Sequence, residues 1–131
     1  MNALKCCRVK CIFLLGALLL SPVLFAQDYY VDSRIGKDKN KGSKKSPFSS
    51  LGKVNTIALK PGDNIFLKAG DTFNGSLRIR DVSGNAQQPI TISTFGDESQ
   101  RAYINAAGEL AGIEIKNSSY INVSNINIEA N

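Results

Sequence analysis

Basic side chains that could bind anions occur in two strand-like segments in the second half of this 131-residue chain. Arg78 and Arg80 are separated by one residue, so on an extended strand both side chains point away from Leu77 and Ile79. Lys116 could project outward from a later segment. Outward cations of this kind could hold an anionic polymer. The alternative is plain solvation, because any polar residue suits an exposed strand face.

Carboxylates are the second group of residues that could carry chemistry. Asp63, Asp71 and Asp97 each follow a glycine, which favours turn-forming aspartates over metal ligands. The Asp-x-Asp-x-Asp pattern of a dedicated calcium loop does not occur, so the sequence predicts no metal site in this stretch. Paired carboxylates could serve glycoside hydrolysis, but no spacing singles out a pair. The available glutamates are Glu109, Glu114 and Glu129.

The composition excludes several kinds of catalysis. The chain has 16 basic and 11 acidic residues, a formal net charge of +5, and no histidine. Its three cysteines are Cys6, Cys7 and Cys11, all close to the N-terminus. Catalysis by Ser-His-Asp or Cys-His groups and zinc binding by Cys/His sets are therefore excluded for the rest of the chain. The remaining chemistry belongs to carboxylates, lysine, arginine, tyrosine and hydroxyl groups.

Residues 1–26 have the features of a signal peptide. Three basic residues lead into the apolar run 11–20, and Ala26 supplies a small residue ahead of cleavage at Gln27. A retained membrane anchor is the alternative, but the apolar stretch is short for a spanning helix. We therefore expect a protein that is secreted, periplasmic or at the cell surface, with no membrane attachment after cleavage. The mature chain would have 13 basic and 11 acidic residues, a net charge of +2, and no cysteine.

Residues 27–62 are expected to form an N-terminal cap. A β-prone run, Tyr29–Val31, begins it. The segment 34–45 follows, with six basic residues and one acid. That composition is typical of a solvated loop, and the alternative is a contact for an anionic polymer. The solvated loop is favoured because no aromatic residue is interleaved with these charges. Nucleic acid is not an expected partner.

The segment 47–59 is predicted to be an amphipathic helix. Ser46 could cap it and Pro47 suits the first helical position. Lys60-Pro61-Gly62-Asp63 would end it. The predicted apolar stripe consists of Phe48, Leu51, Val54 and Ala58.

From residue 63 to residue 131 the chain consists of short alternating runs separated by Gly, Asn, Asp and Ser. Apolar positions recur every 22 to 27 residues, for example from Ile65 to Ile90 and from Leu77 to Ile104. No Asn-Gly or Asp-Gly pair joins two runs as a hairpin, so stacked parallel coils are favoured over a sandwich. The expected strands are 64–68, 76–80, 89–95, 102–105, 112–116, 120–124 and 125–129.

Several strings in the chain resemble a known family. These strings are LKPGDNIFLKAGDTFNG, QPITISTFGD and GIEIKNSSYINVSNINI. They are similar to the N-terminal part of secreted right-handed parallel β-helix proteins of the pectate-lyase-like superfamily. The resemblance implies an all-β solenoid, a right-handed parallel β-helix, with a short capping strand and an amphipathic helix at its N-terminus.

The resemblance also implies a role in polysaccharide degradation, by a lyase or a glycoside hydrolase acting on an acidic polysaccharide. Active residues in the family usually lie in later coils, so no catalytic residue is carried over, and the expected substrate contacts remain Arg78, Arg80 and Lys116. No cofactor is expected here, although calcium could serve a full-length relative. The alternative is a non-catalytic β-helix that binds carbohydrate or adheres to surfaces.

The C-terminal residues bear on whether the coils are complete. Asn131 follows a strand-like run by two residues, with no polar cap after it. Solenoids need about three repeats and capped ends to be stable. We therefore expect residues 63–131 to be the first coils of a longer protein, and this chain alone to be inactive.

Overall fold

The computed structural model describes residues 25–130. The predicted leader, residues 1–26, lies outside this part of the chain except for its last two residues. Within the described part, no helix has the length and apolar character needed to cross a membrane. The elements are β1 (Asp28–Val31), α1 (Leu51–Val54), β2 (Asn64–Lys68), β3 (Thr72–Asn74), β4 (Leu77–Arg80), β5 (Ile90–Phe95), β6 (Ala102–Asn105), β7 (Ile113–Lys116), β8 (Ile121–Val123) and β9 (Ile126–Glu129).

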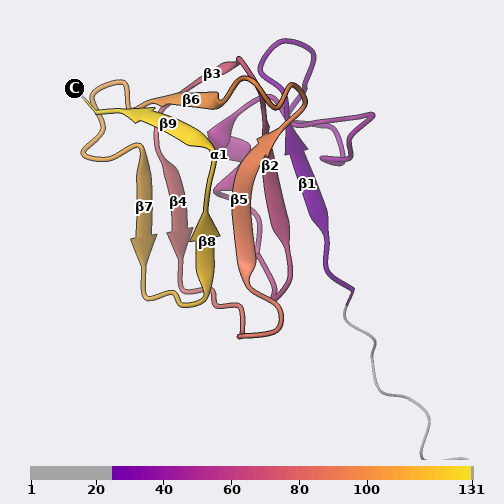
Figure 1. Cartoon of the computed structure of the whole chain (residues 1–131), viewed down its shortest axis with the longest axis vertical. Coiled ribbons are helices and arrows are strands. Elements are labelled where there is room, and N and C mark those ends of the chain that lie inside the picture. The colour runs from indigo at the N-terminus through magenta and orange to yellow at the C-terminus, as the bar shows by residue number, and fades with distance from the viewer. Residues whose placement is uncertain (1–24, 131) are drawn as a thin grey trace, which may run out of the picture.

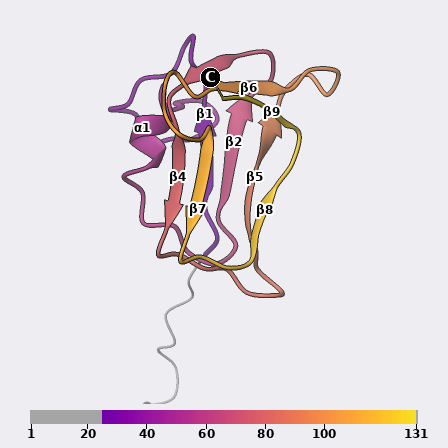
Figure 2. The ribbon, with the colours of Figure 1, turned by 90° about the vertical axis from the view of Figure 1, so that its left-hand side faces the viewer.

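The strands form three sheets in which every pairing is parallel. Their orders are β1-β2-β5-β8, β3-β6-β9 and β4-β7. The chain therefore visits the three sheets in the same order in β2, β3 and β4 and again in β5, β6 and β7 (Figure 1). A turned view shows β4 and β7 beside one another, and β2, β5 and β8 beside one another (Figure 2). This arrangement is β-helix-like and agrees with the predicted all-β class.

The spacing between stacked strands is less regular than the sequence suggests. Ile65 pairs with Ile92, 27 residues later, so the predicted step of 25 is short by two. Leu77 pairs with Ile113, 36 residues later, and the predicted partner Ile104 lies in a different sheet. The prediction of a 22–27-residue period is therefore wrong in detail. Turns of unequal length separate the strands, so the sequence distance between stacked residues varies around the fold.

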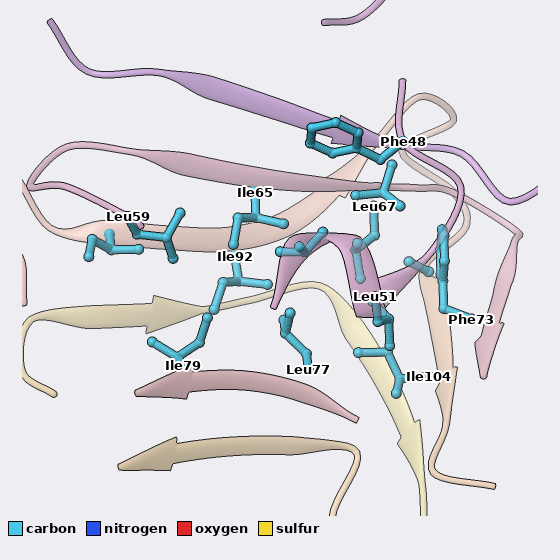
Figure 3. Close-up of a cluster of buried hydrophobic side chains, with 14 residues drawn as sticks. Phe48, Leu51, Leu59, Ile65, Leu67, Phe73, Leu77, Ile79, Ile92 and Ile104 are labelled. Atoms are coloured by element: carbon cyan, nitrogen blue, oxygen red, sulfur yellow. The ribbon is translucent and has the colours of Figure 1, made fainter. Parts of the chain in front are cut away.

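The core lies between the three sheets, where the apolar side of each strand points (Figure 3). In β2, Ile65 and Leu67 are fully buried while their neighbours are half-exposed, as the alternation predicts. Ile92 of β5 and Leu77 of β4 are equally buried. Each such side chain stabilises the fold by about 1.5–3 kcal/mol. The opposite faces of the strands are left to carry the polar and aromatic residues described below.

The predicted amphipathic helix over residues 47–59 is wrong in its extent. Regular helix covers Leu51–Val54 alone, and Ser50, whose hydroxyl accepts from the Lys53 amide at 3.2 Å, is its N-cap. Phe48 is extended instead, because its amide donates to the Tyr30 carbonyl and its carbonyl accepts from the Asp32 amide. Pairing with the edge of β1 thus replaces the first predicted turn.

The first strands have covered edges. The Asn55 side chain donates to the Ser76 carbonyl at 2.9 Å and accepts from the Arg78 amide at 2.7 Å, which occupies the free edge of β4. Backbone bonds from the segment 42–48 cover β1 in the same way. The edges of β7, β8 and β9 have no further strand beside them within residues 25–130. An extended segment and the residue that follows α1 therefore cover the free edges of β1 and β4.

Candidate functional site

The predicted contacts Arg78, Arg80 and Lys116 lie together on the outer face of the sheet β4-β7. Leu77 and Ile79 point into the core, so the two arginines project from the opposite side of β4. Arg80 stands directly beside Lys116 of β7 in the parallel register. The structure thus brings the three residues to one surface, which we call the charged face. Their role in substrate binding stays a prediction.

Two glutamates engage the arginines of the charged face. The Arg78 Nη2 atom lies 2.9 Å from a Glu109 carboxylate oxygen, and its Nε atom lies 3.8 Å from Glu114. The Arg80 Nη2 atom lies 2.5 Å from the same Glu114 oxygen. These side chains are 36–49 % exposed, so each pair adds little to stability. The pairs do balance the two positive charges, which leaves Lys116 without a balancing partner among the described residues.

A hollow of about 230 Å³ lies on the charged face, lined by both arginines and both glutamates. The guanidinium of Arg78 fixes both carboxylates on one side of the strand pair. Carboxylates held in this way can accept hydrogen bonds from sugar hydroxyls, and two carboxylates are also what glycoside hydrolysis requires. Sequence reasoning named Glu109 and Glu114 without pairing them, because Arg78 links them and lies beside Glu114 only through the 36-residue step between β4 and β7.

The lysine-rich loop is a second charged surface. Residues 37–45 carry five exposed lysines, and the loop is held by hydrogen bonds rather than free. The Asp38 carboxylate accepts from the amide and hydroxyl of Ser49 and of Ser50, at 2.6–3.0 Å. Burial would raise the pKa of Asp38, but these four hydrogen bonds outweigh it and lower the pKa below 3.8. The loop therefore presents its lysines from a fixed backbone.

The glycine-preceded aspartates bind protein groups. Asp63 is buried and accepts from the amides of Gln27 and Lys60 at 2.8 and 2.9 Å. Asp71 is also buried, and it accepts from the Ser33 amide at 3.0 Å and pairs with the Arg34 guanidinium. No group of three or more Asp, Glu, His or Cys residues within residues 25–130 is arranged to hold a metal ion. Two of the three turn aspartates thus also join the cap to the first coil.

Comparison with known proteins relates this fold to carbohydrate-active proteins. No family model matches the chain. The chain is 43% identical over 101 residues to lacto-N-biosidase of Bifidobacterium longum subsp. longum. The match covers 74% of this chain and 6% of that protein. The chain thus spans a small part of this relative's length.

Solved structures show the same architecture. The crystal structure of GH136 lacto-N-biosidase from Eubacterium ramulus superposes with a TM-score of 0.73 and 27% identity, over 79% of this chain and 20% of that one. A rhamnogalacturonan lyase superposes with a TM-score of 0.59 and 20% identity, over 79% of this chain and 28% of that one. The second similarity concerns the fold alone. Both similarities support a β-helix-like fold, and the first relates it to a carbohydrate-active protein.

Proposed function

We propose that this chain is the first part of a right-handed β-helix solenoid in a protein that degrades glycans by glycoside hydrolysis. The parallel three-sheet framework carries the proposal, because it superposes on the structure of a lacto-N-biosidase. The sequence of the chain is also 43% identical to part of a second lacto-N-biosidase. Hydrolysis is preferred to a lyase reaction, since the likeness to the lyase lies at 20% identity. Residues 27–62 would serve as the cap and residues 63–131 as the first coils.

The charged face is the proposed contact for the glycan on this part of the protein. Its arginines and glutamates offer both donors and acceptors around one hollow. Ion pairing inside the face leaves little net charge for attracting a uronate polymer. The proposed substrate is therefore bound through its hydroxyl groups, by a surface of mixed charge rather than by isolated cations.

A second candidate function is binding of an anionic polysaccharide without turnover. The five exposed lysines of the loop 37–45 favour it, because they carry concentrated positive charge on an ordered backbone. The predicted leader supports both candidates, since each requires a protein that is exported to meet its glycan.

The test measures binding and turnover by the purified chain on one panel: oligosaccharides containing lacto-N-biose, polygalacturonate, alginate and a glycosaminoglycan. We expect binding to at least one neutral oligosaccharide without released product, because this stretch holds the cap and first coils. Glu114→Gln should weaken that binding, while Lys60→Gln, an exposed change outside the charged face, should not. Absorbance from unsaturated uronate would instead indicate a lyase, and the absence of binding to every glycan would contradict the proposal.

A further inference from the structure

Three aromatic side chains gather on the outer face of the sheet β1-β2-β5-β8. The rings of Tyr30 and Phe66 are 5.3 Å apart between centroids, and those of Tyr30 and Phe95 are 5.0 Å apart, edge to face. The Lys68 ammonium lies 5.1 Å from the centre of the Phe95 ring. These side chains point outward because Ile65, in alternation with them, points into the core. We call this cluster the aromatic patch.

A hollow of about 370 Å³ adjoins the aromatic patch at the corner between β5 and β6. Gly96, with a φ of 106°, turns the chain at this corner, and a side chain there would meet the Lys68 ammonium. Asp97 then accepts from the hydroxyl and amide of Ser99, which lowers the pKa of Asp97 and keeps it ionised. We call the space the corner hollow. Its side chains include Phe95, Asp97, Glu98, Gln100, Arg101 and Asn125.

The polar groups of the corner hollow have unused bonding capacity. Within residues 25–130, the side chains of Glu98, Gln100, Arg101 and Asn125 form no hydrogen bond or ion pair with another side chain or with the backbone. On the charged face, in contrast, Arg78 is held by two glutamates. The corner hollow therefore offers donors and acceptors that are free to bind a ligand.

We propose that the corner hollow and the adjoining aromatic patch bind one or two pyranose rings of an uncharged oligosaccharide. A volume of about 370 Å³ lies at the lower end of the range of about 300–1,000 Å³ for small-molecule sites. A pyranose ring has an apolar C–H face, which suits an aromatic ring such as Phe95. It also has hydroxyls around its edge, which suit carboxylate, amide and guanidinium groups.

The balance of charges around the corner hollow favours an uncharged ligand. Asp97 and Glu98 contribute two negative charges at the corner hollow, and Arg101 and the nearby Lys68 contribute two positive ones. A uronate would therefore meet a carboxylate for each cation, and its binding would gain no net attraction. The ligand class rests on the proposed function in glycan degradation, whereas the place of binding rests on the aromatic patch and the corner hollow alone.

The test uses the purified chain with two probes, the neutral disaccharide lacto-N-biose and the anionic trisaccharide trigalacturonate. Saturation-transfer and chemical-shift NMR report binding and its location. We expect lacto-N-biose to shift amide signals of residues 94–101, and Arg101→Ala to raise its dissociation constant about tenfold, equivalent to about 1.4 kcal/mol. Phe95→Ala should do the same. Gln87→Ala, an exposed change on another turn, is the matched control and should leave binding unchanged.

The outcomes separate this inference from the proposed function. Lacto-N-biose could bind the Arg101→Ala and Phe95→Ala proteins as tightly as the unchanged chain, with shifts confined to β4 and β7. That result would overturn the corner hollow as the binding site and leave the proposed glycan function standing. Trigalacturonate that shifts the amide signals of residues 94–101 and binds there more tightly than lacto-N-biose overturns the uncharged ligand. The absence of any lacto-N-biose signal overturns it as well. The proposed function fails by its own measure, the absence of binding across the whole glycan panel. Because Arg101 is exposed, its variant should keep the native spectrum even if Phe95→Ala does not fold.

Discussion

The Asp71 carboxylate joins the N-terminal cap to the first coil, and its removal should destabilise the chain measurably. Its side chain is 2% exposed, and one oxygen accepts from the Ser33 amide and hydroxyl at 3.0 and 2.9 Å. The other oxygen lies 3.0 Å from the Arg34 Nε atom. A hydrogen bond to a charged group contributes about 1.5–3 kcal/mol. The Arg34 side chain is 74% exposed, so its ion pair adds only about 0–1 kcal/mol.

We therefore expect Asp71→Ala to lower the free energy of unfolding by about 2–4 kcal/mol, since the Ser33 amide loses its acceptor. Asp71→Asn keeps one acceptor oxygen and a similar volume, so its loss should be smaller, about 1–2 kcal/mol. Urea unfolding followed by circular dichroism measures both. The urea midpoint should fall while the slope of the unfolding free energy against urea concentration stays unchanged, which would show lower stability without a change in the surface exposed on unfolding.

Asp97→Ala is the matched control, because Asp97 also follows a glycine but is exposed and bonds only within its own turn. It should change the free energy of unfolding by no more than about 0.5 kcal/mol. An equal loss for the Asp71 and Asp97 variants, or no loss for either, would refute the argument. The two aspartates would then be simple turn formers, with no contribution from the contact between cap and coil.

Three further predictions test other parts of the chain. A Cβ at Gly36 would lie 2.0 Å from the Phe48 carbonyl oxygen, so Gly36→Ala should lower thermal stability by more than about 2 kcal/mol. A Cβ at Gly52 would make only an ordinary contact, 3.7 Å from the Ser50 hydroxyl, so Gly52→Ala should be neutral or stabilising. The hydrogen bond from the Tyr103 hydroxyl to the Glu129 carboxylate raises the pKa of the tyrosine above its ordinary value of 10.0. This hydrogen bond stabilises the fold while the tyrosine is protonated, and the stabilisation is lost as the pH rises through the raised pKa. Ultraviolet titration should find the pKa lowered in Glu129→Gln, and an unchanged curve would contradict this. Polygalacturonate binding through the lysines of residues 37–45 should weaken as salt rises from about 0.01 to 0.15 M; affinity that is independent of salt would exclude the loop.

The strands other than β3, which the sequence did not predict, could be located because their signal is local. Alternation at Ile65 and Leu67 places one face in the core regardless of what the rest of the chain does. The true extent of the helix could not be predicted, because the apolar stripe of residues 47–59 has helical spacing whether or not its first residues are helical. The amide and the carbonyl of Phe48 both bond along one edge of β1, at Tyr30 and Asp32. This tertiary pairing outweighs the local preference of Ser46 and Pro47 for a helix start.

The sites were only partly predictable because they depend on register. Arg78 and Arg80 could be placed on one face from their spacing alone. Their pairing with Glu114 required the step of 36 residues between β4 and β7, and no sequence periodicity carries that number. Tyr30 and Phe95 are further apart still in sequence, and they meet only because β1, β2 and β5 lie in one sheet. A pattern of 22–27 residues would not have brought either set together.

The three polar surfaces of the chain differ in how far their charges are balanced. The arginines of the charged face are matched by glutamates, and the corner hollow balances two carboxylates against Arg101 and Lys68. The lysines of residues 37–45 are the concentrated positive charge that lacks such balance within the described part of the chain. The proposed attraction for an anionic polymer therefore lies with the cap, whereas the proposed recognition of sugar hydroxyls lies with the coils. A neutral glycan on the coils and an acidic surface on the cap would not compete for this chain, because the two proposals rely on different residues and different forces.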